Sequence, residues 1–282
     1  MTVRIVTDSA CDLTDEEASS LGIDIVPLSI RFGDQQFLDR EELSVDDFYR
    51  RMAASDDLPQ TAAPAPGAFE AVFRRRIAEG ADGVVCINLS SGVSATMQSA
   101  ETGAREITGD IRIIDSRSVT GGLGTMVLAA AEAAGNGASA DEVVALVEDL
   151  RARTRVYAAI DTLENLKKGG RIGGAQALLG SMLSIKPLID MSTGVVEEAG
   201  RQRTRRKSLA WLRDKVAELV AEGGGGVERL SVMHAKADDI DVLLDMLAPL
   251  VDPAATRVGL IGPVVASHGG PGVVGLCFTL RA

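Results

Sequence analysis

The sequence predicts an α/β protein of two domains, with an N-terminal, mainly parallel sheet flanked by helices and a C-terminal α+β domain. Short β-branched runs alternate with helical patterns throughout the first half, as in successive βαβ units. The pattern changes after about Arg155, which divides the chain into residues 1–155 and residues 156–282. With 282 residues, the chain is long enough for two domains of ordinary size.

The first half opens with a strand-like run at 3–7, after which Thr14 starts a short helix. Ser44, with Asp47 three residues later, resembles a capping box, and Ser139 caps the last helix of this half. The other elements that we expect here are an extended run at 23–31, helices at 46–54, 68–78, 94–107, 121–134 and 141–153, and strands at 83–89 and 111–115. Strands and helices that alternate in this way are typical of a parallel sheet.

The second half lacks this regular alternation, which favours an α+β arrangement. A glycine-rich basic stretch occupies 167–174, and a second glycine-rich segment around His268 is expected to be a loop between strands. The expected strands are 156–160, 185–191, 195–199, 230–234, 257–261 and 273–280, and the expected helices are 175–183, 207–222 and 239–250.

The composition excludes several classes of protein. A net charge of −11 and an aromatic content of 3% argue against a general nucleic-acid surface and against stacking platforms for single strands. Cys11, Cys86 and Cys277 are odd in number and widely spaced, so neither a disulfide framework nor a zinc site is indicated. No signal-peptide pattern and no membrane-length apolar run occur, so we expect a cytoplasmic protein without integral membrane association.

The charge is distributed unevenly along the chain. Residues 1–150 carry 11 bases and 26 acids, whereas residues 151–213 carry 13 bases and 5 acids. The members of this basic segment that we propose for docking an acidic partner or phosphates are Arg203, Arg205, Arg206 and Lys207. A solvated face is the alternative interpretation of such a charge run.

Known catalytic and nucleotide motifs are absent or incomplete. The phosphate loop of NTPases, the G-x-S-x-G elbow and H-E-x-x-H do not occur, and two histidines are too few for a histidine-rich metal site. Gly122 and Gly124 open a helix after a strand, as in a dinucleotide loop, but Val127 stands where the third glycine is required. Tight helix packing is therefore the favoured interpretation of these glycines. We expect neither a metal nor a resident cofactor.

Three loops carry side chains suited to an anion. Ser94 lies in a serine-rich segment, 90–96, between a buried strand and a helix, where hydroxyls and free N–H groups gather, although helix capping is an equally good explanation. Thr61 lies in the preceding strand-to-helix loop, at what should be the same edge of the sheet. His268 lies among glycines that allow a close backbone approach.

Several segments in this order resemble the DegV family of bacterial fatty-acid-binding proteins. They are IVTDS at 5–9, Thr61 with Pro64, SSGVSATMQSA at 90–100, LENLKKGGRIGGAQALLGSMLSIKP at 163–187, QRTR at 202–205 and HGGPG at 268–272. The segment at 163–187 is the most specific of these. The resemblance extends over nearly the whole chain.

The resemblance implies that a long-chain fatty acid such as palmitate lies between the two domains. It further implies that Thr61 and Ser94 hold the carboxylate, with His268 as a third contact. The chain would then be a non-catalytic subunit that presents the acid to an ATP-dependent fatty acid kinase for acyl-phosphate formation and phospholipid synthesis. In such proteins the basic residues near Arg203 are associated with partner or phosphate contact.

This sequence departs from the family pattern at several positions beside the expected site. Ala62 replaces a serine, Ala95 a glycine and Met97 an aromatic residue. The preference for chain length and unsaturation therefore does not follow from the resemblance.

For the wall of the acyl tunnel, two interpretations of one apolar segment stay open, because ordinary core packing explains the same residues equally well. The candidates are Leu178, Leu179, Met182, Leu183, Ile185 and Leu188. Two other functions remain open at this point. One is an enzyme acting on a small carboxylated or phosphorylated metabolite, with Ser94 as nucleophile and His268 as base. The other is a regulatory protein that senses lipid.

Overall fold

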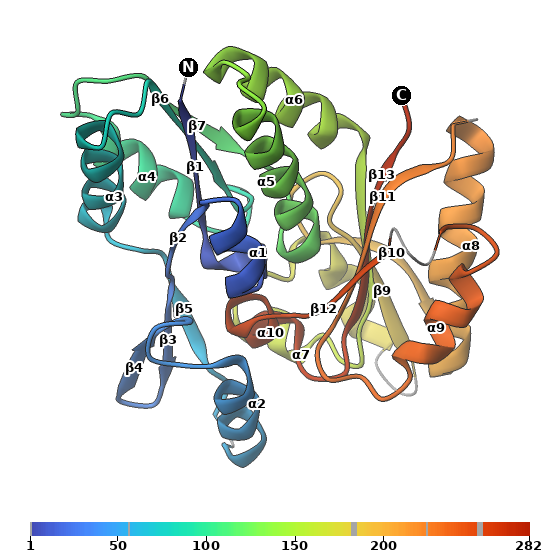
Figure 1. Cartoon of the computed structure of the whole chain (residues 1–282). Helices are drawn as coiled ribbons and strands as arrows, with labels where there is room; N and C mark the ends of the chain where they lie inside the picture. Colours follow the sequence, from blue (N-terminus) through green and yellow to red (C-terminus); the bar gives the residue numbers. More distant parts are fainter. Residues whose placement is uncertain (1, 56, 182–184, 224, 253–255) are drawn as a thin grey trace.

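The computed structural model describes residues 2–55, 57–181, 185–223, 225–252 and 256–282, and it confirms the predicted α/β class. The first sheet has four parallel strands in the order β2-β1-β6-β7 (Figure 1). Its strands are β1 (Val3–Asp8), β2 (Asp24–Val26), β6 (Gly83–Asn88) and β7 (Ile111–Asp115). All six residues of β6 are buried, as expected for a central parallel strand covered on both faces.

Helices cover both faces of this sheet. They are α1 (Asp15–Ser20), α3 (Pro66–Ala78), α4 (Thr96–Ala104), α5 (Thr120–Gly135) and α6 (Ala140–Arg153). Successive strand residues point to opposite faces, so Val6 packs with Phe69 and Phe73 of α3, whereas Ile5 belongs to the larger core on the side of α5. No helix in the described ranges is long and apolar enough to cross a bilayer.

Side-chain caps determine where several helices begin. Thr14 and Glu17 form a reciprocal capping box at α1, and Ser139 and Glu142 form another at α6. The N-terminal cap by Ser44 is present at α2 (Val45–Ala54), where the hydroxyl accepts a hydrogen bond from the Asp47 N–H. The N-termini of these helices follow from local sequence, because each capping side chain satisfies N–H groups that the helix itself leaves without partners.

A small antiparallel sheet in the order β4-β3-β5 projects beside α2 (Figure 1). Its strands are β3 (Ser29–Phe32), β4 (Gln35–Leu38) and β5 (Gln60–Ala62). The prediction of a loop at Thr61 was wrong, because Thr61 lies in β5 and pairs with Ile30. Strand β5 has only three residues, too few to show a periodicity in the sequence. It forms because it pairs with β3, which is distant in sequence.

The second sheet has six strands in the order β10-β9-β8-β13-β11-β12 and is antiparallel except for β11 and β12. Its strands are β8 (Thr154–Ala159), β9 (Lys186–Asp190), β10 (Glu197–Gln202), β11 (Val227–His234), β12 (Thr256–Leu260) and β13 (Val274–Leu280). Helices α8 (Arg205–Gly223) and α9 (Ile240–Leu247) cover one face, where Leu212 and Leu243 pack with Phe278. Helices gathered on one face of a mainly antiparallel sheet make an α+β unit.

The segment around His268 is not the loop that the sequence predicted. His268 lies in helix α10 (Pro263–Gly269), which begins with a proline in its first turn and ends before Gly270, whose φ is +86°. The glycines that suggested a loop only end the helix. Two further short elements are α7 (Glu164–Lys168) and a 3₁₀ helix, η2 (Gly173–Ser181), which replaces the expected α-helix at 175–183 over its described part.

Helix α5 lies between the two sheets and is buried from Thr120 to Val127 (Figure 1). Its glycines allow this close approach, since a Cβ on Gly124 would lie 2.6 Å from the Cys11 carbonyl oxygen, and one on Gly121 would lie 2.8 Å from Met233 Cγ. The largest core contains residues of both halves, including Ile5 and Cys277. The proposed boundary at 155/156 therefore falls within β8, at the start of the second sheet, and the largest core extends across it.

Replacing Gly124 by alanine should lower the free energy of unfolding by about 1–3 kcal/mol, because the new methyl group would overlap a backbone carbonyl that has no room to move. Gly135, at the end of the same helix, has no atom within 4 Å of its Cβ position and supplies the control. Gly135→Ala should be neutral or stabilising by up to about 1 kcal/mol. Urea denaturation of both variants checks this, and equal effects would contradict the packing role of Gly124.

Candidate functional site

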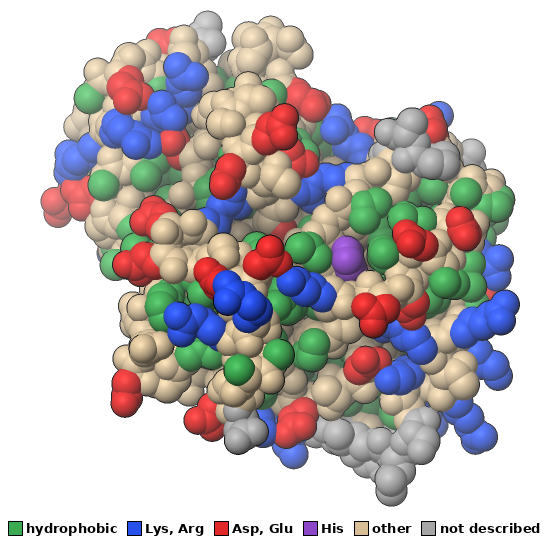
Figure 2. Space-filling model, turned by 60° about the horizontal axis from the view of Figure 1, so that its bottom comes forward, with side chains coloured by type: hydrophobic (Ala, Val, Ile, Leu, Met, Phe, Trp, Pro, Cys, Tyr) green, Lys and Arg blue, Asp and Glu red, His purple; other side chains and the backbone are tan. Residues whose placement is uncertain are grey.

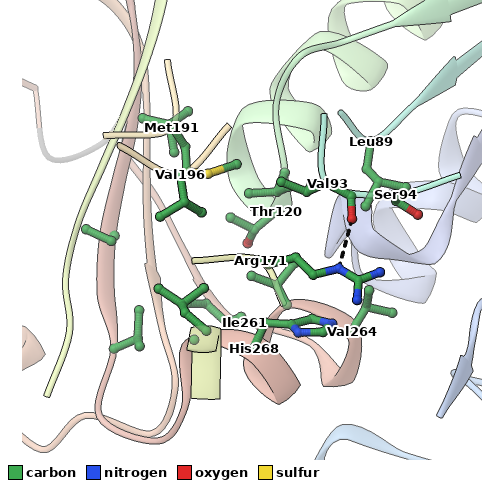
Figure 3. A pocket seen from close by; sticks show the side chains of 18 of the residues that line it. Leu89, Val93, Ser94, Thr120, Arg171, Met191, Val196, Ile261, Val264 and His268 are labelled. Atoms are coloured by element: carbon green, nitrogen blue, oxygen red, sulfur yellow. Dashed lines mark hydrogen bonds between the residues drawn. The ribbon is translucent and has the colours of Figure 1, made fainter. Parts of the chain in front are cut away.

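A cavity of about 270 Å³ lies where the two halves meet, beside the beginning of α5 (Figure 3). Its volume is close to the lower end of the range for small-molecule sites, about 300–1,000 Å³. The N-terminal half contributes Thr61 from β5 and the segment after β6 that includes Ser94. The second half contributes strands β8 and β9 and helix α10, which carries His268.

Most of the wall is aliphatic. Its apolar side chains, several of them labelled in Figure 3, include Leu89, Val93, Val156, Ile160, Ile189, Met191, Val196, Ile261 and Val264. They come from elements far apart in sequence, and together they form a surface suited to a hydrocarbon chain. The polar side chains Thr61, Ser94 and His268 border the same cavity.

Three of the residues proposed for the tunnel wall, Leu178, Ile185 and Leu188, are described, and they do not line this cavity. Leu178 is buried in the large core, and Leu188 points to the opposite face of β9, where it packs with the α8 side of the sheet. Neither they nor Ile185 is among the described residues that line the cavity. Met182 and Leu183 lie outside the described residues, and only the backbone of Leu179 is described. The next residue along β9, Ile189, does line the wall.

Thr61 and His268 form a direct pair across the two halves. Thr61 Oγ1 lies 2.8 Å from His268 Nε2, although the residues are 207 positions apart in sequence. Strand β5 positions the threonine through its pairing with β3, and α10 packs against β3, β5 and α7. The sequence singled out both residues, and the structure brings them together.

The His268 ring is held in its neutral form. Burial, with a smaller contribution from the Arg171 charge, lowers the pKa of His268 to about 4. Its Nδ1 atom is buried without a hydrogen-bond partner in the described part of the chain. A buried lone pair is tolerated better than a buried unpaired N–H, which favours the tautomer protonated at Nε2. Nε2–H then donates to Thr61 Oγ1, and the threonine O–H is free to donate to a ligand.

Ser94 lies at the start of α4, and its hydroxyl is 2.9 Å from that of Thr96. The Thr96 N–H also donates to Ser94 Oγ, at 3.3 Å. Ser94 is not the helix cap, because the N-cap residue of α4 is Ala95, and no side chain makes a capping hydrogen bond at this helix start. A serine oxygen has a further donor and acceptor capacity, and Ser94 also borders the cavity. Ligand contact therefore stays a prediction for this residue.

Asp8, a residue that sequence reasoning did not select, holds the segment leading to Ser94. Its fully buried carboxylate accepts hydrogen bonds from the Leu89 N–H at 2.8 Å, the Asn88 amide at 3.1 Å and the Ala10 N–H at 3.1 Å. Burial raises the pKa of Asp8 to about 6, against the effect of these three donors. The sequence did contain a signal for Asp8, because it ends strand β1, and ligands bind at this edge of doubly wound sheets.

Arg171 is the basic residue closest to the candidate site. Its guanidinium donates from Nε to the Val93 carbonyl at 3.1 Å and from Nη1 to the Gly169 carbonyl at 2.7 Å, which fixes it between the halves (Figure 3). Arg171, Thr61 and His268 also border a second cavity of about 600 Å³, which is polar and includes Lys168. The Thr61–His268 pair therefore separates an apolar compartment from a basic, polar one.

The geometry does not provide a nucleophile and base pair. Among the described residues no hydrogen bond joins Ser94 to His268, whose Nε2 contacts Thr61 instead. The other ring nitrogen, Nδ1, lacks the carboxylate that orients the base in a catalytic triad. A search of the same residues finds no group of three His, Cys, Asp or Glu side chains that could hold a metal ion.

The basic segment proposed for docking lies at the start of α8, away from the cavity. Arg203, Arg206 and Lys207 are exposed, and Figure 2 shows Lys and Arg side chains gathered along the side of the molecule that carries this helix. Arg205 differs, because its guanidinium donates to both oxygens of Asp239, at 2.8 Å and 2.9 Å. It therefore links α8 to the start of α9, and the other three remain the candidates for a partner surface.

The neutral state of His268 predicts a specific loss of stability in acid. The unfolded histidine binds its proton near its ordinary pKa of 6.5, whereas the folded one does so near 4. Between these pH values the unfolded chain holds the extra proton, so lowering the pH through this window favours unfolding, by up to about 3 kcal/mol. His268→Gln should remove this contribution. Urea denaturation of both proteins at several pH values checks the difference, and parallel pH profiles would contradict it.

Comparison with known proteins places the whole chain in one family. The family model described as "Uncharacterised protein, DegV family" matches residues 2–281. A DegV domain-containing protein of Deinococcus radiodurans is 37% identical over 279 residues and covers 98% of each chain, and one of Streptomyces coelicolor is 36% identical over 281 residues and covers 99% of each.

Solved structures agree with the sequence relatives. A DegV family protein from Thermus thermophilus, described as binding fatty acid, has a TM-score of 0.89 at 33% identity and covers 100% of both chains. The fatty-acid-binding DegV of Bacillus subtilis has a TM-score of 0.88 at 27% identity, also covering 100% of both chains. A stearic-acid-binding protein from Eubacterium ventriosum has a TM-score of 0.86 at 26% identity and covers 99% of this chain and 98% of its own. The chain belongs to the DegV family.

Proposed function

We propose that this chain binds a long-chain fatty acid, with the tail in the aliphatic cavity and the carboxylate at Thr61, Ser94 and His268. The observation that carries the proposal is the polar pair Thr61–His268 at the border of a cavity with an otherwise aliphatic wall. The structural relatives from Thermus thermophilus and Bacillus subtilis, which are described as fatty-acid-binding, support the same ligand class.

The tail and the head group would contribute differently to binding. A palmitate tail with about 15 methylene-type groups gains on the order of 12 kcal/mol by burial at ~0.8 kcal/mol each, before the costs of ordering are subtracted. Each hydrogen bond to the carboxylate adds about 1.5–3 kcal/mol. The cavity wall therefore determines most of the affinity, whereas Thr61, Ser94 and His268 determine where along the cavity the acid stops.

The role we assign to the bound acid is presentation to an ATP-dependent fatty acid kinase in the cytoplasm, which forms an acyl phosphate for phospholipid synthesis. The polar cavity supports this role, because it borders the same Thr61–His268 pair and provides a route to the carboxylate. The chain is then a carrier subunit without catalysis of its own. The exposed basic residues Arg203, Arg206 and Lys207 would contact the partner.

Replacing Ser94 by alanine should weaken palmitate binding about tenfold, because one hydrogen bond to a buried carboxylate is lost. Ser91 is the matched control. It lies three residues earlier in the same segment, is exposed, and donates to Asp115 Oδ2 at 2.5 Å instead of bordering the cavity. Ser91→Ala should leave the affinity within about twofold of wild type. Titration with palmitate, followed calorimetrically, measures both.

The same preparations test the proposed function itself. Organic extraction and mass spectrometry of the purified wild-type protein should recover long-chain fatty acid. The proposal is wrong if the protein carries no fatty acid and does not take up added palmitate. If palmitate binds equally well to wild type and Ser94→Ala, the ligand class stands but Ser94 is removed from the site.

Arg203→Ala should spare palmitate binding but raise the KM of a partner fatty acid kinase for the loaded protein several-fold, because long-range attraction to an acidic surface is reduced. Arg105→Ala, which removes an exposed arginine at the end of α4, is the charge-matched control. The KM values of wild type and Arg203→Ala should differ at low salt and converge at high salt, since screening weakens the same attraction. Equal KM values for the two variants would refute docking through Arg203.

A further inference from the structure

The polar cavity that borders the Thr61–His268 pair has more room than a carboxylate needs. Its volume is about 600 Å³, and its lining comes from β3, the turn after it, β5 and the ends of α7 and α10. In the proposed function the tail of the acid lies in the aliphatic cavity, on which the same pair also borders. A head group at this pair therefore lies next to a second, larger space.

The lining of the polar cavity is positively charged. Of the described residues that form it, Arg31, Lys168 and Arg171 are cationic and Asp57 is the one acid. The whole chain carries a net charge of −11, so this cavity differs in sign from the molecule around it. Cations gathered in a concave space attract an anion, and they attract a dianion more strongly than a carboxylate.

These cations are available to a ligand. Arg31 donates to the side-chain oxygen of Gln60, and Arg171 donates to two backbone carbonyls, so neither arginine has a carboxylate partner in the described part of the chain. Lys168 forms an ion pair with Glu164 at 2.6 Å. Both side chains of that pair are more than half exposed, and an exposed pair is weak enough for a ligand to replace it.

The carbonyl groups at this cavity do not oppose an anion. Helices α7 and α10 both end there, and the C-terminal end of a helix carries partial negative charge. Side-chain donors already occupy two of these carbonyls: Arg171 Nη1 donates to Gly169 at 2.7 Å, and Asn165 Nδ2 donates to Ser267 at 3.4 Å. The remaining charge of the lining is that of the cations.

The position of Arg31 fits a group attached to the carboxylate. Arg31 pairs with Gln60 in the β3–β5 ladder, and Thr61 is the next residue along β5. One residue along a strand corresponds to about 3.4 Å, which is also the scale on which a phosphoryl group extends a carboxylate. An acid that is held at Thr61 and then phosphorylated would place its new group beside Arg31.

We infer that the polar cavity is a phosphoryl site that holds the head group of an acyl phosphate, with Arg31 and Lys168 as its contacts. This rests on the proposed function, because it assumes that an acyl chain occupies the aliphatic cavity. A phosphoryl group has up to two negative charges and three terminal oxygens, which suit an arginine fork and a mobile lysine. The chain therefore binds the activated acid more tightly than the free acid.

The test uses 2-oxoheptadecylphosphonate, a stable analogue of palmitoyl phosphate in which a methylene replaces the bridging oxygen. In calorimetric titrations, wild type should bind this phosphonate about tenfold more tightly than palmitate. Arg31→Gln and Lys168→Gln should each weaken binding of the phosphonate about tenfold, because one charged contact is lost, and leave the affinity for palmitate within about twofold. Lys167→Gln is the matched control, since it removes the same charge from an exposed neighbour that does not line the polar cavity.

Inorganic phosphate distinguishes an acyl phosphate from a free anion. Titrated into the palmitate-loaded protein, it should bind at least about a hundredfold more weakly than the phosphonate, because it lacks the tail. Comparable affinities would make the polar cavity a site for free phosphate and overturn the inference. It is also overturned if wild type binds the phosphonate no more tightly than palmitate, or if Arg31→Gln and Lys168→Gln act no more strongly than Lys167→Gln. Failure of wild type to bind either acyl ligand would instead overturn the proposed function.

Discussion

The burial of helix α5 between two sheets is the constraint on which the rest of the structure depends. The helix packs on β1 of the parallel sheet and on β8, β11 and β13 of the second sheet. A helix buried on opposite sides needs small residues where another backbone approaches closely, and Gly121 and Gly124 provide them. Helix α5 therefore fixes the distance between the two sheets, and a single core extends across both halves.

The site follows from this arrangement, because its parts come from opposite sides of α5. The distance between Thr61 and His268 depends on how β5 and α10 are placed, and α10 packs on elements of both halves. Further bonds connect the halves at the same place: Ser90 Oγ donates to the Gly194 carbonyl at 2.5 Å, and Arg171 donates to the Val93 carbonyl. A polar region at Thr61 and His268 beside an aliphatic compartment results.

Burial also determines the charge of the polar groups beside the cavity. Burial makes His268 neutral, so the pair with Thr61 brings no charge into the apolar compartment. Asp8 is buried as well, but three donors surround its carboxylate and connect the end of β1 to the segment before Ser94. Asp8 therefore supports the segment that carries Ser94.

Much of the fold could be predicted from the sequence because its signals are local. The capping residues Thr14 and Ser139 and the uninterrupted apolar run of β6 determine helix starts and a buried strand within a few residues. The same holds for the polar candidates: Thr61, Ser94 and His268 could be selected from short segments, and all three border one cavity.

What the sequence alone determined is the order of the elements, the fold class and the family resemblance, and it selected polar residues that border one cavity. Only the tertiary structure decided that β5 is a strand, that His268 lies on a helix, and that Ile189 rather than Leu188 faces the cavity. It also revealed the left-handed backbone of Thr120, which has no signature in the sequence. These features depend on contacts between residues that are distant in sequence, and packing in three dimensions, not local preference, determines which side chains such contacts leave facing a cavity.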